Sequence, residues 1–229
     1  MYLLLFALVP SLAFIIMVWR MDKVEKEPFG LLLKLFLLGM LSCLPAILLE
    51  SAGEAFFLQF FDESSLLYII IDNFITVALV EEACKLFFLY RGSWKNRNFN
   101  YSFDGIVYAV CVGIGFAFFE DIFYIIDGDI TTAILRAVLS IPGHGVYAIL
   151  MGHYYSRARI MQSIGRKSTR RSNMWKALLV PSFFHGLYDF CLSTESLLLV
   201  AGIVIFEIVL YVQAYKTMRM RSKSDTPMP

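Results

Sequence analysis

Long runs of apolar residues, separated by short polar segments, cover most of this chain. A helix needs roughly 17–25 mostly apolar residues to cross a bilayer, and seven runs reach or approach this length: residues 2–19, 29–49, 66–90, 104–126, 131–155, 175–192 and 196–215. Hydrophobic residues make up 59% of the 229, too many for a soluble domain to bury. The pattern predicts an all-α, polytopic membrane protein of about seven transmembrane helices, a bundle forming one integral domain over residues 1–229.

The charges between these runs alternate in sign. One set of connections and the C-terminal tail carry Arg20, Lys23, Lys26, Arg91, Lys95, Arg97, Arg157, Arg159, Arg166, Lys167, Arg170, Arg171, Lys216, Arg219, Arg221 and Lys223. The other connections carry Glu50, Glu54, Asp62, Glu63, Asp127, Asp129 and Glu195. Because cytoplasmic loops are rich in Lys and Arg, we expect the N-terminus outside and the C-terminus inside. The longest connection, residues 156–174, is expected to be a basic cytoplasmic loop in contact with lipid headgroups or serving only as a topology signal.

Ionisable residues also lie inside the apolar runs, where each costs several kcal/mol unless it faces a cavity or a partner. Four of the predicted helices carry them: Glu81, Glu82 and Lys85; Glu120 and Asp121; His144; and His185 with Asp189. The four-residue spacing places Glu81 and Lys85 on one helix face, and the same holds for His185 and Asp189. We expect these side chains to converge on one intramembrane polar cavity.

Other polar residues in the runs have simpler explanations. Asp104 opens the fourth run and is expected to be an N-cap. His153 lies nine residues after His144, points to the other side of its helix and is assigned no role. Arg136 and Glu207 are expected to pair with other charges. The four cysteines lie in apolar stretches, so we expect free thiols of low nucleophilicity.

This constellation favours water-activating hydrolysis inside the membrane. A buried carboxylate near a cation can act as general base on water, and imidazoles can stabilise the oxyanion that forms. The natural substrate at this depth is a peptide bond of a transmembrane or juxtamembrane segment.

Three alternatives use the same residues. Glu120, His144 and His185 are a conceivable zinc ligand set, which is disfavoured because no H-E-x-x-H motif is present. The pairing of Lys85 with a glutamate is also compatible with a purely structural ion pair in a non-proteolytic membrane scaffold. A transporter that relays protons through these charges is expected to show two related halves, and the sequence has no such repeat.

The motifs resemble, in order, those of the PrsW family of bacterial intramembrane proteases. The resemblance rests on Glu81-Glu82-x-x-Lys85, Phe116-x-x-x-Glu120, His144 in the next helix and His185-x-x-x-Asp189. The strings D-G-I-V-Y at 104–108 and P-S-F-F-H-G-L-Y-D at 181–189 are similar to that family too, so the resemblance covers nearly the whole chain.

The resemblance implies a multi-pass protease of the bacterial cytoplasmic membrane. It would make the first, extracytoplasmic cut in a single-span anti-sigma factor, after which a second intramembrane protease acts on the product and a sigma factor is released. The lipid bilayer and the anti-sigma factor are thus the expected partners, and no nucleic acid is expected.

The family is distantly similar to the type II CAAX prenyl endopeptidases, in which the first glutamate of the pair activates water without a metal. This implies no cofactor, Glu81 as the base and Glu82 as the partner of Lys85. Glu120, His144 and His185 would then surround the water and the carbonyl. A similar scaffold subunit of γ-secretase keeps histidines without being a protease. At position 121 the resemblance leads us to expect an amide as often as an acid, so the role of Asp121 stays open.

Overall fold

The computed structural model describes residues 2–194 and 196–229, so the predicted outer acid Glu195 lies outside the described residues, as does the side chain of Asp127. The described part is helical, with one isolated β-bridge between Tyr101 and Pro227. Its helices are η1 (Tyr2–Leu4), α1 (Leu5–Met21), α2 (Phe29–Phe57), α3 (Leu66–Ile71), η2 (Asp72–Leu79), α4 (Val80–Ser93), α5 (Asp104–Asp127), α6 (Ile130–Leu135), η3 (Arg136–Ser140), α7 (Ile141–Ser163), α8 (Lys167–Ser193) and α9 (Leu197–Lys223).

All seven predicted runs are helical, which confirms the all-α fold class. Four helical segments have the length and apolar composition to cross a membrane: Phe29–Phe57, Asp104–Ile126, Ile130–Ser163 and Leu197–Lys223. These segments fit a membrane protein, while the total of seven spans and their orientation stay predictions.

Two predicted connections are wrong. α7 continues to Ser163 and α8 begins at Lys167, so most of the expected loop 156–174 is helix and only a short turn at Gly165 joins the two. α2 continues to Phe57, which places Glu50 inside a helix and not in a connection. In both cases polar residues of good helix propensity extend a helix past its apolar run.

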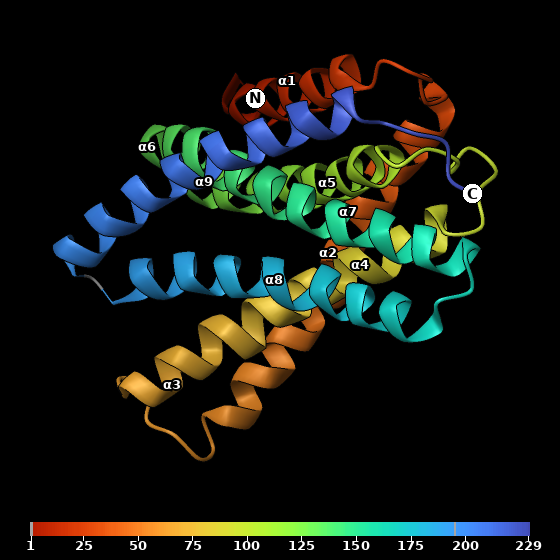
Figure 1. The fold of residues 1–229 in the computed structure, drawn as a ribbon. Helices are drawn as coiled ribbons and strands as arrows, with labels where there is room; N and C mark the ends of the chain where they lie inside the picture. The colour runs from red at the N-terminus through yellow and green to blue at the C-terminus, as the bar shows by residue number, and fades with distance from the viewer. Residues whose placement is uncertain (1, 195) are drawn as a thin grey trace.

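α5 lies at the centre of the bundle and packs against α2 and α7 (Figure 1). Its crossing with α2 is very close because both helices present glycine there. A Cβ on Gly39 of α2 would run into the carbonyl oxygen of Val112, and one on Gly115 of α5 into that of Phe36. Small residues let membrane helices approach in this way. From this contact the helices spread apart toward the end where α3, α6 and the start of α9 lie (left in Figure 1).

Two π-helical segments, η2 and η3, interrupt the helices that carry the predicted site. η3 ends two residues before Pro142, which has no N–H to donate to the carbonyl of Val138, so the regular α-helical pattern cannot continue through this turn. η2 directly precedes Glu81 and Glu82. Both segments change the direction of the side chains that follow, and such π segments are frequent at functional sites.

The predicted N-cap role of Asp104 is wrong. The cap position of α5 is Phe103, and Asp104 is the first helical residue. Its Oδ2 accepts the backbone N–H groups of Asn100 and Tyr101 at 2.9 and 2.6 Å. The N–H of Phe103 is instead bound by Oδ1 of Asp225 at 2.8 Å. The C-terminal tail therefore holds the backbone of the residue at which α5 begins.

Candidate active site

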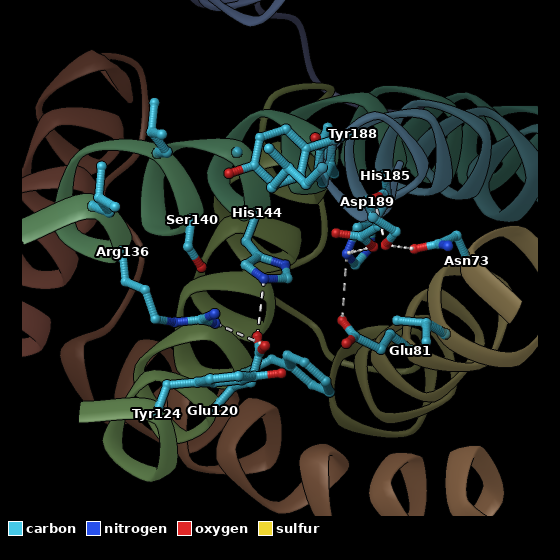
Figure 2. A pocket seen from close by; sticks show the side chains of 18 of the residues that line it. Asn73, Glu81, Glu120, Tyr124, Arg136, Ser140, His144, His185, Tyr188 and Asp189 are labelled. Atoms are coloured by element: carbon cyan, nitrogen blue, oxygen red, sulfur yellow. Dashed lines mark hydrogen bonds and ion pairs between the residues drawn. The ribbon is translucent and has the colours of Figure 1, made fainter. Parts of the chain in front are cut away.

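A cavity of about 910 Å³ lies between the spreading helices. Every helix from α2 to α9 except α3 contributes to its wall, together with η2 and η3. Of the residues predicted to form the site, those that line the cavity are Glu81, Phe116, Glu120, His144, His185 and Asp189 (Figure 2). The predicted convergence is therefore present in the structure. Glu82, Lys85 and Asp121 are buried beside the cavity, at 0–2% exposure.

Lys85 is the centre of a buried charge cluster. Its Nζ donates to Oε2 of Glu81 at 2.9 Å and to Oε1 of Glu82 at 2.8 Å, so the predicted pairing on α4 is confirmed for both glutamates. The same Nζ lies 3.0 Å from Nδ1 of His144 and 4.0 Å from the centre of the Phe116 ring. An ammonium has three N–H donors and no acceptor. All three donors of Lys85 are therefore in use.

The contacts of His144 define its tautomer. Because the ammonium of Lys85 can only donate, Nδ1 of His144 must be the acceptor, and the ring proton is on Nε2. Nε2 lies 3.0 Å from Oε2 of Glu120, an ion-pair distance. His144 thus connects α5 to the Lys85 cluster on α4.

His185 is held between carboxylates of two helices. Its Nδ1 lies 3.1 Å from Oε1 of Glu82, and its Nε2 lies 3.2 Å from Oδ2 of Asp189, which confirms the predicted pair on α8. Nε2 is also 3.9 Å from Oε2 of Glu81, too far for a direct hydrogen bond. The ring of Tyr147 stacks on His185 with centroids 5.2 Å apart. The imidazole plane is therefore fixed, with Nε2 near Glu81.

Arg136 anchors the opposite side of the cavity, as Figure 2 shows. Its Nη2 donates to Oε1 of Glu120 at 2.8 Å and its Nε donates to Oδ1 of Asp121 at 2.5 Å. The guanidinium also lies 3.8 Å from the centre of the Tyr124 ring. The expectation that Arg136 pairs with other charges is confirmed. Asp121 is one of the two acids that form an ion pair with Arg136.

The expectation for Glu207 is wrong. Oε1 of this buried residue on α9 accepts the hydroxyl of Tyr147 at 2.7 Å, a neutral partner, and no ion pair to Glu207 is found within the described residues. Tyr147 can reach Glu207 because it lies one turn after His144, on the side of α7 that faces α9. A phenol can satisfy a buried carboxylate without a second charge.

Several lining residues were not identified from the sequence. Among them are Glu50, Asn73, Tyr147 and Tyr188. Tyr147 and Tyr188 lie three residues after His144 and His185, on the same helix faces as those histidines. Helical spacing therefore indicates from the sequence that both tyrosines face the site. Oδ1 of Asn73 accepts the hydroxyl of Ser193 at 3.0 Å. These residues are far apart in the sequence, so no local pattern predicts the contact.

The types of side chain in the cluster are those that bind zinc. Glu81, Glu82, His144 and His185 each offer a ligand atom, all within 4.8 Å of one another. However, three of these four side chains already contact the Lys85 ammonium, at 2.8–3.0 Å. A zinc ion would have to displace this covalently attached cation, so the cluster as arranged does not fit one. Among the described residues, the zinc set Glu120, His144 and His185 is not assembled either, because Glu120 is not part of the group whose ligand atoms converge.

All four cysteines are buried free thiols, as predicted. His153 lies outside the cavity lining and makes an edge-to-face contact with Tyr154. Of the four thiols, that of Cys43 lies at the cavity wall, while His153 is not part of the cavity lining.

Comparisons with known proteins agree on one family. The profile of a family described as "PrsW family intramembrane metalloprotease" matches residues 27–215. "Protease PrsW" of Clostridioides difficile (strain 630) is 33% identical over 213 residues, which are 91% of this chain and 87% of that protein. "Protease PrsW" of Halalkalibacterium halodurans is 29% identical over 223 residues, 97% of this chain and 98% of that protein. No solved structure matches the chain.

Proposed function

The chain belongs to the PrsW family of intramembrane proteases, and from this premise we propose that it is a glutamic-type endopeptidase of the bacterial cytoplasmic membrane. Its reaction is the first, extracytoplasmic cut in a single-span anti-sigma factor. A second intramembrane protease then acts on the product, and a sigma factor is activated. The observation that carries the proposal is the cavity, in which Glu81 stands beside a buried ammonium and two imidazoles.

Glu81 is the better base of the two adjacent glutamates. Its side chain lines the cavity, where a water molecule and a peptide can reach it. The side chain of Glu82 is 0% exposed, and its Oε1 binds both Lys85 and His185. Glu82 therefore acts as the fixed anion of the cluster, and Glu81 is left to accept a proton.

The reaction follows from this arrangement. A water between Oε2 of Glu81 and Nε2 of His185 would bridge their 3.9 Å separation. Glu81 takes a proton from this water, and the hydroxide oxygen bonds to the carbonyl carbon of the peptide. The C–N bond then breaks, and the departing amine takes the proton that Glu81 holds. The carboxylate is regenerated, so protons and electrons balance.

The histidines assist in different ways. Nε2 of His185 lies at the cavity wall next to the attack position and stabilises the oxyanion as it forms. His144 uses both nitrogens for Lys85 and Glu120. Its role is to hold Lys85, and through Lys85 the base, in position. Phe116 packs under the ammonium, and Asp189 orients His185.

We propose that this chemistry needs no metal, although the family description says metalloprotease. Lys85 pairs with both glutamates and so places a cation of the protein itself at the centre of the cluster. In a low-dielectric site a fixed ammonium performs the charge stabilisation that a metal ion supplies elsewhere.

The cellular test is co-expression of the chain with each single-span anti-sigma factor of the host genome. We expect one of them to be shortened on its extracytoplasmic side only when the chain is present. If every anti-sigma factor stays intact, with the chain correctly inserted in the membrane, the proposed substrate class is wrong.

A further inference from the structure

One carboxylate in the cavity has no part in the proposed reaction. Glu50 on α2 lines the cavity, and its Oε1 is buried without a hydrogen-bond partner. The other acids of the wall are paired: Glu81 with Lys85, Glu120 with Arg136, and Asp189 with His185. Within the described part of the chain, Glu50 is thus the lining acid that lacks both a hydrogen bond and an ion pair.

An unpaired carboxylate at this depth is costly. A charged group in a membrane protein normally faces a partner or a water-filled pathway, and Glu50, which is half-buried with Oε1 shielded from solvent, loses solvation without gaining a partner. Among the residues that the structure describes, no salt bridge joins Glu50 to a cation, and Lys85 and Arg136 are engaged with other acids. A cation brought into the cavity by a ligand would remove this cost.

The position of Glu50 relative to the base follows from α2. Cys43, Ile47 and Glu50 share the face of α2 that lines the cavity. Cys43 packs in one cluster with Phe116, whose ring lies 4.0 Å from the Lys85 ammonium, so Cys43 marks the level of the reaction. Seven residues at a helical rise of 1.5 Å place Glu50 about 10 Å farther along, toward the C-terminal end of α2.

We propose that Glu50 is a specificity-determining residue that binds a Lys or Arg side chain of the substrate, about three residues from the scissile bond on its extracytoplasmic side. This inference rests on the proposed peptidase function. An extended peptide advances about 3.3 Å per residue, so the separation of about 10 Å corresponds to about three residues. The aliphatic stem of the basic side chain would lie along apolar wall residues such as Ile47 while its charged end reaches Glu50.

The test is a peptide library presented to the purified full-length chain in lipid nanodiscs. Each synthetic peptide carries one apolar span and a ten-residue flank in which every position is randomised. Sequencing of the cut products by mass spectrometry gives the residues enriched on each side of the cut. Four forms are compared: wild type, Glu50→Gln, Glu50→Lys and the control Glu54→Gln. Glu54 lies one turn farther on the same helix, is exposed and does not line the cavity.

We expect wild type and Glu54→Gln to enrich Lys and Arg at least tenfold over Glu, two to four residues outside the cut. Glu50→Gln should lose this enrichment while still cutting peptides, and Glu50→Lys should enrich Asp and Glu at the same place. Equal enrichment in wild type and Glu50→Gln would overturn the inference and leave the peptidase function intact. If wild type cut no peptide at all, the peptidase proposal would fall, and the Glu50 subsite with it.

Discussion

The ammonium of Lys85 lies 3.0 Å from Nδ1 of His144, and this contact joins the two sides of the cavity. On one side His144 continues to Glu120 and Arg136. On the other side Lys85 continues to the glutamate pair of α4, and Glu82 continues to His185. The ionisable residues of four helices therefore form one connected network, whose single buried ammonium contacts three of its members.

Replacing Lys85 by Met should destabilise the fold strongly. The change leaves Glu81 and Glu82 buried without their cation, and breaking a buried pair in this way costs about 3–5 kcal/mol. Thermal unfolding in detergent micelles measures the effect, with Lys176→Met, an exposed lysine of α8, as the control. If both variants unfolded at the wild-type temperature, Lys85 could not be the cation that stabilises this cluster.

The proposal that the reaction needs no metal predicts the zinc content of the active protein. Purified, active chain should contain far less than one zinc per chain by elemental analysis, and chelators should leave its proteolysis unchanged. The physical reason is that Lys85 already fills the cation position among the candidate ligands. Zinc at one per chain, lost together with activity and restored by added zinc, would contradict this proposal.

Two buried acids between α1 and α2 predict a pH dependence of stability that is separate from the active site. Burial raises the pKa of Asp22 from 3.8 to about 6 and that of Glu27 from 4.5 to about 7. The groups that act on their charge are Glu25, Lys26, Asp104, Tyr108 and Asp225. Because both acids hold their protons more tightly in the folded state, their contribution is fully present below about pH 4 and is lost as the pH rises through 6 and 7.

The unfolding temperature of wild type should therefore fall more steeply between pH 5 and pH 8 than that of the double variant Asp22→Asn, Glu27→Gln. Glu63→Gln, a change at an exposed acid, should keep the wild-type slope. Parallel curves for the double variant and wild type would show that these two acids do not titrate as their burial requires.

The cut should fall in the outer juxtamembrane region of the substrate, within a few residues of the point where its helix enters the bilayer. The cavity lies where the helices spread apart, at the end opposite the basic connections, and a helix end already lacks hydrogen-bond partners and unwinds most easily. Mass spectrometry of both fragments locates the bond. A cut on the cytoplasmic side would contradict the predicted orientation.

The sequence was sufficient for those parts of the site that local spacing determines. The four-residue intervals from Glu81 to Lys85 and from His185 to Asp189 set shared faces on any helix, so these pairs could be predicted. Contacts between helices could not, because the pairing of Arg136 with both Glu120 and Asp121 depends on how α5 and η3 cross.

The sequence pattern predicts Glu50 in a connection instead of a helix, for a different reason. The apolar run of α2 ends near residue 49, but the helix continues to Phe57 and turns Glu50 into the cavity. Hydropathy marks where an apolar run ends, whereas the end of a helix depends on propensity and packing. The same limit explains why the loop predicted at 156–174 is mostly helix.

The cleavage rate of Glu81→Gln decides whether Glu81 is the base that activates water. Gln keeps the size of the side chain and can still bind Lys85 through its carbonyl oxygen, but it cannot accept a proton from water. Wild type, Glu81→Gln and the control His153→Ala are purified, checked for equal folding and incubated with a single-span substrate, and the initial rate of cleavage is measured. The account predicts a loss of at least 100-fold for Glu81→Gln and a near-wild-type rate for His153→Ala. A Glu81→Gln protein that cuts at close to the wild-type rate would show that Glu81 is not the base.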